Sequence, residues 1–118
     1  MQYENDIRDR TKKFAVEIIK IVVELKKEGI EYPLRDQILR SGTSIGANVK
    51  EARASSSKKE LIRFFEIALR SCDETEYWFE VIEMGYELKK EKFETTKTEL
   101  KEITKVIAKI IINLKSQL

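Results

Sequence analysis

The chain has 118 residues, of which 42% are hydrophobic and 37% charged, a balance that suits one folded domain with one core and argues against intrinsic disorder. Its net charge of +2 excludes a general polycation, so an anionic partner would have to meet a local basic patch. Because the chain has no histidine and one cysteine, Cys72, it cannot form a His-based triad, a His-ligated zinc site or an internal disulfide.

The first predicted helix covers about residues 5–28. Its main face repeats at steps of three and four, the period of a helix, through Ile7, Thr11, Phe14, Ile18, Val22 and Leu25. A second apolar line widens this face and consists of Ala15, Val16, Ile19 and Val23. We therefore expect this helix to pack against at least two neighbours. Asn5 or Asp6 is expected to cap its start, and Gly29 to end it.

The second predicted helix covers about residues 34–54. It follows the only proline, Pro33, which fits the first turn of a helix. Its apolar line is Leu34, Ile38, Ile45, Val49 and Ala52, with the small Ser41 and Gly42 between them. Gly42 and Gly46 each cost a helix about 1 kcal/mol relative to alanine, which indicates close helix contact or a bend. We favour one helix with a local irregularity over two shorter helices.

The third and fourth helices are predicted over about residues 58–88 and 94–117. Ser57 followed by Glu60 is a capping-box pattern, which sets the start of the third helix after a serine loop. The apolar stripe of the third helix consists of Leu61, Phe64 or Phe65, Ala68, Cys72, Thr75, Phe79, Ile82 and Tyr86. The apolar stripe of the fourth helix consists of Leu100, Ile103, Ile107, Ile110 and Leu114. Four helices with short connections predict an all-α, antiparallel up-down-up-down four-helix bundle, a single domain over residues 1–118.

Polar residues interrupt the apolar faces of the second and third helices at helical spacing. The set is Ser44, Asn48 and Glu51 on one helix and Ser71 and Glu74 on the other. One interpretation is a functional polar site between the helices. The interpretation we favour is a structural network that fixes helix register, because polar groups in a core must be hydrogen-bonded. Cys72, on the main apolar stripe, is expected to be an inert core residue.

Three consecutive aromatic residues, Tyr77, Trp78 and Phe79, cannot all face one core from a single helix. At least one of them must lie at a second contact surface, and aromatic residues are enriched at protein interfaces. Tyr77 and Trp78 are therefore predicted to lie at an interface between subunits, in preference to a ligand pocket.

Charge is unevenly distributed along the chain. Residues 35–63 carry seven basic and three acidic side chains, residues 64–100 carry five basic and ten acidic ones, and residues 101–118 carry four lysines and one glutamate. We predict a basic patch that binds RNA or DNA without sequence preference, formed by Arg40, Lys50, Arg53, Lys58, Lys59 and Arg63. The alternative is that these side chains form an ordinary solvated rim.

Three motifs resemble a known family: SIGANVKEA at residues 44–52, SKKELIRFFEIAL at 57–69 and SCDETEYW at 71–78. The family is that of the four-helix-bundle proteins first noticed as products of intervening sequences in bacterial 23S rRNA genes. The resemblance implies a homo-oligomer, commonly a homopentameric ring, without enzymatic activity. Relatives include the accessory variability determinant of diversity-generating retroelements, which binds nucleic acid and a reverse transcriptase. Ser44, Asn48, Glu51 and Glu74 match the family's polar positions.

The leading hypothesis is a non-enzymatic, homo-oligomeric bundle that binds RNA or DNA as an accessory protein, with a nucleic-acid enzyme such as a reverse transcriptase as a further partner. The alternative is a protein–protein interaction scaffold with no nucleic-acid role. An enzyme would need a pocket with carboxylates of perturbed pKa or a lysine base, for which the region around Glu51 and Glu74 is a candidate. No cofactor or metal is expected.

A cytoplasmic location is expected, without membrane attachment. The N-terminal segment MQYENDIRDRTKK is charged and polar, unlike a signal peptide. The most apolar run, near residues 105–114, is interrupted by Lys109 and Asn113 and is too short to span a bilayer.

Overall fold

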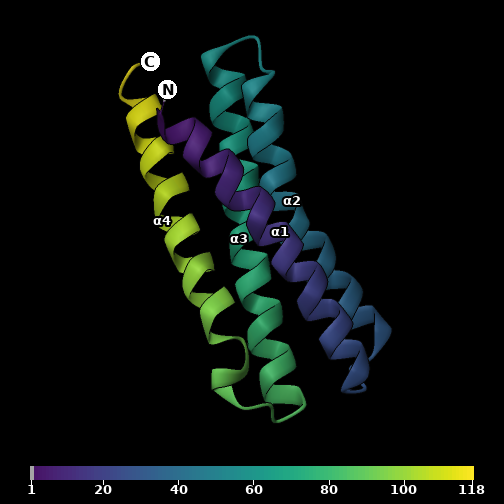
Figure 1. The fold of residues 1–118 in the computed structure, drawn as a ribbon. Coiled ribbons are helices and arrows are strands. Elements are labelled where there is room, and N and C mark those ends of the chain that lie inside the picture. Colours follow the sequence, from purple (N-terminus) through teal and green to yellow (C-terminus); the bar gives the residue numbers. More distant parts are fainter. Residues whose placement is uncertain (1) are drawn as a thin grey trace.

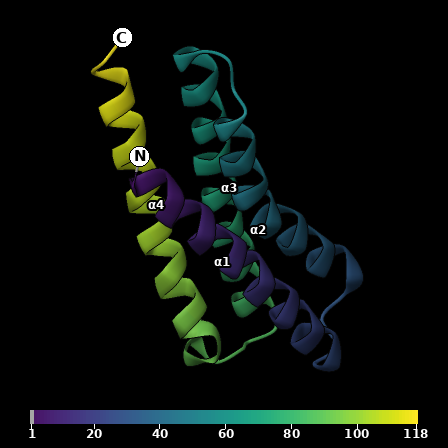
Figure 2. The same cartoon turned by 45° about the horizontal axis from the view of Figure 1, so that its top comes forward.

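The computed structural model describes the backbone of residues 2–118 and the side chains of residues 7–118. Within this range the chain forms α1 (Gln2–Lys27), α2 (Tyr32–Arg53), α3 (Lys58–Gly85), the short 3-10 helix η1 (Lys90–Phe93) and α4 (Glu94–Lys115). Both α1 and α3 pack against α2 and α4, so successive helices are neighbours and α1 lies diagonally opposite α3 (Figures 1 and 2). The predicted all-α up-down-up-down bundle is confirmed, and it measures 47 × 21 × 20 Å.

The helix ends lie within two residues of the predicted ones, with two larger differences. α1 begins at Gln2, earlier than expected, and the side chains of the expected caps Asn5 and Asp6 lie outside the described ones. Gly29 ends α1 as predicted, with a φ of +81° that favours glycine. α3 ends at Gly85 and not near residue 88, because Glu87 adopts the left-handed conformation (φ 53°) and reverses the chain toward η1.

The start of α3 is fixed by its cap. The Ser57 hydroxyl accepts a hydrogen bond from the Glu60 backbone N–H at 3.1 Å, as the capping-box pattern predicts. The Glu60 carboxylate reaches back to the backbone N–H of Ser56 at 3.2 Å, one residue before the usual partner. Together these bonds satisfy two backbone donors at the turn between α2 and α3.

α2 runs unbroken through its two glycines, so the favoured single helix is confirmed and the alternative of two shorter helices is wrong. A methyl group on Gly42 would lie 2.7 Å from Cγ1 of Ile18, and one on Gly46 would lie 3.1 Å from the carbonyl oxygen of Thr11. Both glycines therefore face α1 and let the two backbones approach closely.

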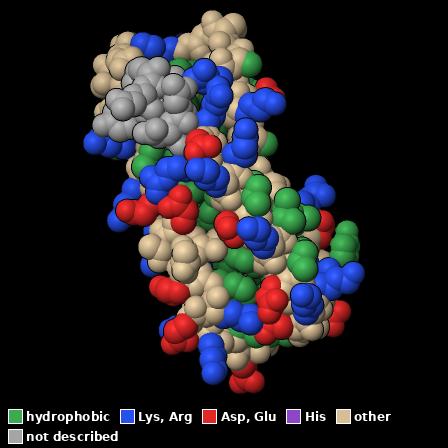
Figure 3. All heavy atoms as spheres, viewed as in Figure 1, with side chains coloured by type: hydrophobic (Ala, Val, Ile, Leu, Met, Phe, Trp, Pro, Cys, Tyr) green, Lys and Arg blue, Asp and Glu red, His purple; other side chains and the backbone are tan. Residues whose placement is uncertain are grey.

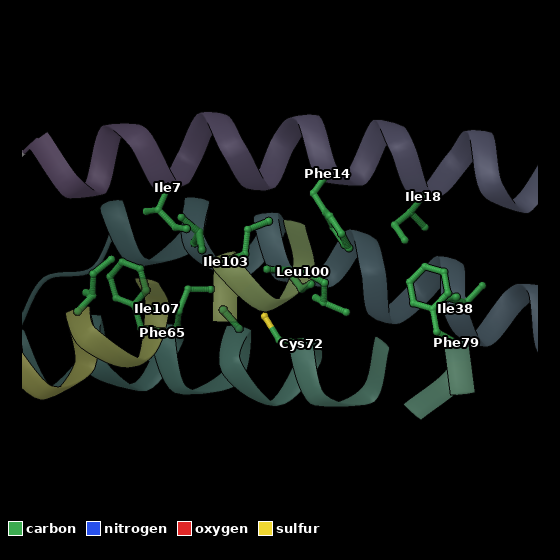
Figure 4. Packing of buried hydrophobic residues seen from close by; sticks show 14 of the residues in the cluster. Ile7, Phe14, Ile18, Ile38, Phe65, Cys72, Phe79, Leu100, Ile103 and Ile107 are labelled. Carbon is green, nitrogen blue, oxygen red and sulfur yellow. The ribbon is translucent and has the colours of Figure 1, made fainter. Parts of the chain in front are cut away.

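The core draws on all four helices (Figure 4). Phe14 of α1, Phe65 of α3 and Ile103 of α4 are at most 2% exposed. Of the two residues predicted as alternatives on the stripe of α3, Phe65 is therefore the buried one. Burying each such side chain contributes about 1.5–3 kcal/mol. The second apolar line of α1 is not buried as expected: Val16, Ile19 and Val23 remain about half exposed, because α1 has neighbours on two sides only.

None of the helices in the described part of the chain is long and apolar enough to cross a membrane.

Candidate nucleic-acid interface

A basic groove lies between the first half of α1 and the second half of α2, with a volume of about 700 Å³. Its charged lining consists of Arg8, Asp9 and Lys12 from α1 and Lys50 and Arg53 from α2. The other lining residues are small: Ala15, Thr43, Gly46, Ala47 and Ala54. Among the described lining residues Asp9 is the only acid, and its carboxylate lies 3.0 Å from the Lys13 ammonium. The groove is therefore positively charged, and basic side chains gather over this region in Figure 3.

Helix geometry explains why these side chains converge. Arg8, Lys12 and Ala15 are spaced by four and three residues on α1, and Gly46, Lys50 and Arg53 are spaced likewise on α2, so each set follows one helix face. Because the helices are antiparallel, the beginning of α1 faces the end of α2. Small residues near Gly46 keep the space between the faces open, and the long cationic side chains border it.

The structure brings only part of the predicted basic patch together. Lys50 and Arg53 line the groove, and Lys58 and Lys59 begin α3 at the same end of the bundle, after the turn that follows Arg53. The Lys58 ammonium also donates to Oε1 of Gln117 at 2.9 Å. Arg63 is exposed one turn further along α3.

Arg40 does not join the groove, because it lies ten residues before Lys50 and therefore about 15 Å away along the axis of α2. Arg8 and Lys12, by contrast, line the groove but were missed by counting charges along the sequence. The signal that could have revealed them is the antiparallel topology, which places the start of α1 beside the end of α2.

A ladder of hydroxyl groups joins α2 to α3. Oγ of Ser71 lies 3.0 Å from Oγ of Ser44, and Oγ1 of Thr75 lies 3.0 Å from Oγ of Ser41. Nδ2 of Asn48 donates to Oγ of Ser44 at 3.0 Å and to its carbonyl oxygen at 2.9 Å. Every buried side-chain nitrogen and oxygen among the described residues has a hydrogen-bond partner, so these groups are satisfied within the protein.

The structure thus joins Ser44, Asn48 and Ser71 of the predicted network but leaves out Glu51 and Glu74, which are both exposed. Their carboxylates remain in water because burying an unpaired charge is unfavourable. The network also contains the Ser41–Thr75 pair, which the sequence interpretation did not include.

The aromatic run divides between core and surface. Phe79 is buried, Trp78 is half-buried against the core, and Tyr77 is 57% exposed. The rings of Tyr77 and Trp78 meet edge to face, with their centroids 5.0 Å apart. Tyr77 is therefore the member of the run that is most accessible to a partner.

Cys72 is expected to be unreactive in the folded protein. The side chain is buried, and burial raises the pKa of its thiol from 9.0 to about 11, against a smaller lowering by the Thr104 hydroxyl. Because the thiolate is the nucleophile, a disulfide reagent at pH 8 should label the native protein at least about 100-fold more slowly than the denatured one. Similar labelling rates would contradict this assignment.

The same shift predicts a loss of stability in alkaline solution. The folded state holds the Cys72 proton up to about pH 11, whereas the unfolded chain releases it near pH 9.0, so stability falls as the pH rises between these values. A difference of about two pKa units corresponds to roughly 2–3 kcal/mol. Denaturant titrations from pH 8 upward should show this decrease in the free energy of unfolding. In a Cys72→Ala variant the decrease should be smaller by about the same amount, roughly 2–3 kcal/mol.

Comparisons with known proteins agree with the fold and the motifs. No curated protein matches the sequence. A solved structure, described as a protein of unknown function from the S23 ribosomal protein family of Bacteroides thetaiotaomicron VPI-5482, is 38% identical, with a TM-score of 0.87 over 92% of this chain and 97% of that one. The family model for the 23S rRNA-intervening sequence protein matches residues 3–109. The chain therefore belongs to the 23S rRNA-intervening sequence protein family.

Proposed function

We propose that this protein is a non-enzymatic, self-assembling helical bundle that binds RNA or DNA, as an accessory subunit of a larger complex in the bacterial cytoplasm. The observation that carries the proposal is the groove in which Arg8 and Lys12 of α1 meet Lys50 and Arg53 of α2. In a ring of five copies, as the resemblance implies, the groove would occur five times, and the positive electrostatic potentials of the five grooves would add. A nucleic-acid enzyme such as a reverse transcriptase is the proposed partner of the complex.

The spacing of the cations suits a phosphate backbone. Arg8 and Lys12 are four residues apart, about 6 Å along the helix, and Lys50 and Arg53 are three apart, about 4.5 Å. Both steps exceed the rise of about 3.4 Å per charge along one nucleic-acid strand, so neighbouring cations can contact different phosphates. The described lining contains no aromatic residue on which a base could stack, so the groove is suited to backbone binding without sequence preference.

The test is charge reversal at the two lysines of the groove. The Lys12→Glu/Lys50→Glu variant should bind mixed-sequence RNA or DNA at least about 10-fold more weakly. The negative slope of log K against log salt should become shallower by about two, because two phosphate contacts are lost. The matched control is Lys89→Glu/Lys105→Glu, which changes the net charge equally at exposed positions elsewhere. Fluorescence anisotropy over a salt series would measure both quantities.

Equal affinity in the groove variant, the control and the unmodified chain would remove the groove from nucleic-acid binding. Failure of the unmodified chain to bind RNA or DNA would favour the alternative, a protein–protein interaction scaffold. Exposed apolar side chains on α1 give that alternative its support.

A further inference from the structure

α1 carries an apolar stripe that no other described part of the chain covers. Val16, Ile19 and Val23 are 48%, 50% and 52% exposed, and their spacing of three and four residues places them along one side of the helix. Figure 3 shows hydrophobic side chains gathered over the middle of α1. Because α2 and α4 occupy the flanks of α1, this outward face, here called the α1 stripe, is free to meet another molecule.

The border of the α1 stripe is basic. Its exposed lysines are Lys12, Lys13, Lys20, Lys26 and Lys27, and the exposed Asp9 on the same side is 3.0 Å from the Lys13 ammonium. The carboxylates of α1 on the α4 side are engaged within the molecule: Glu17 lies 3.6 Å from the Lys20 ammonium, and Glu24 lies 3.6 Å from that of Lys92 in η1. A surface that fits the stripe should therefore combine apolar side chains with negative charge.

The outward face of α3 has that combination. Tyr77 is 57% and Met84 80% exposed, and Val81 lies half-buried between them at the intervening helical position. Residues 71–88 contain no lysine or arginine and six acids: Asp73, Glu74, Glu76, Glu80, Glu83 and Glu87. Only Glu83 of these forms an ion pair within the described residues, with Lys97. The α3 face is thus apolar at its centre and acidic around it.

We propose that the α1 stripe of one copy docks on the α3 face of a second copy. Contact between two α1 stripes would bring their lysines together, and contact between two α3 faces would bring their carboxylates together; both arrangements are repulsive. A bundle face of about 47 × 21 Å is also large enough for the roughly 800 Å² that each partner contributes to a standard interface.

The position of these faces sets the type of assembly. α1 and α3 are diagonal in the bundle (Figure 2). The exposed side chains of both faces point away from the core, so the faces lie on opposite sides of the molecule. Contact between unlike faces is heterologous, and it closes into a ring or continues as a filament; it does not form a two-fold dimer. This inference rests on the self-assembly in the proposed function, but it does not depend on nucleic-acid binding.

The test uses one variant for each face. Ile19→Glu/Val23→Glu places charge on the α1 stripe, and Tyr77→Lys/Met84→Lys does so on the α3 face; all four positions are at least half exposed, so the bundle should still fold. Light scattering without nucleic acid should show each variant as a monomer. Mixed in equal amounts they should form a dimer, because each still has the face that the other has lost.

A matched control is Ile112→Glu on α4, where the replaced side chain is 67% exposed but lies on neither face; it should retain the assembly of the unmodified chain. Either face variant with unchanged mass, or a mixture that stays monomeric, would overturn the inference while leaving nucleic-acid binding to be judged by the groove variant. A monomeric unmodified chain would overturn both the inference and the proposed self-assembly.

Discussion

Replacing Gly42 with alanine should lower the free energy of unfolding by about 2 kcal/mol, even though alanine is the better helix former by about 1 kcal/mol. The added methyl group would lie 2.7 and 2.9 Å from Cγ1 and Cγ2 of Ile18, closer than carbon atoms can approach. Ile18 is fully buried, and its branched side chain has few alternative rotamers. Either α1 or this side chain must shift, and overpacking of this kind costs about 1–3 kcal/mol.

Denaturant unfolding would measure this loss, and the chain contains its own controls. A methyl group on Gly85, at the end of α3, would meet no atom within 4 Å, so Gly85→Ala should leave stability unchanged or raise it. Gly46→Ala should lie between the two, because its methyl group would be 3.1 Å from the Thr11 carbonyl oxygen and α1 could yield slightly. Equal stability changes at Gly42 and Gly85 would contradict the close-contact interpretation.

Removing the ammonium group of Lys97 should destabilise the protein by about 3 kcal/mol. Lys97 lies 2.6 Å from the Glu83 carboxylate, and these side chains are only 20% and 11% exposed. The same ammonium donates to the carbonyl oxygen of Lys90 at 3.1 Å, so it ties η1 to both α3 and α4. Lys97→Met would leave a poorly hydrated carboxylate without its partner; breaking a fully buried pair costs about 3–5 kcal/mol.

A double-mutant cycle would separate the loss of the pair from the isolation of one charge. Lys97→Met/Glu83→Leu should recover most of the stability, because no unpaired charge then remains. Lys105→Met is the matched surface control: its ammonium is 3.4 Å from Glu102 but 78% exposed, and its removal should change stability by less than about 1 kcal/mol. A double variant less stable than Lys97→Met would contradict this account.

Helical periodicity made the bundle predictable from the sequence. The line from Leu100 to Leu114 was expected to be buried, and each of its members is. Choices between adjacent residues were harder, since Phe64 and Phe65 fit the stripe almost equally and only the packing of the neighbouring helices selects Phe65. The end of α3 was misjudged because Gly85, the glycine at which the helix ends, was not taken as a stop, and the left-handed residue that reverses the chain is Glu87.

The candidate site was less predictable because it joins segments that are distant in the chain. Counting charge along the sequence found Lys50 and Arg53 but could not pair them with Arg8 and Lys12 of another helix. Helical spacing likewise placed Glu51 beside Ser44 and Asn48, but spacing alone does not show how far a long side chain extends into solvent. Both cases depend on the position of a neighbouring helix, which local patterns do not contain.

The hydroxyl ladder between α2 and α3 has a consequence for how related sequences can diverge. Ser44 pairs with Ser71 and Ser41 pairs with Thr75, so loss of one hydroxyl removes a partner of the other. Loss of one hydroxyl leaves the other with only the partner on its own helix, whereas exchange of both members of a pair for alanine or valine removes the polar groups together. Across relatives, we therefore expect positions 44 and 71, and positions 41 and 75, to change in step.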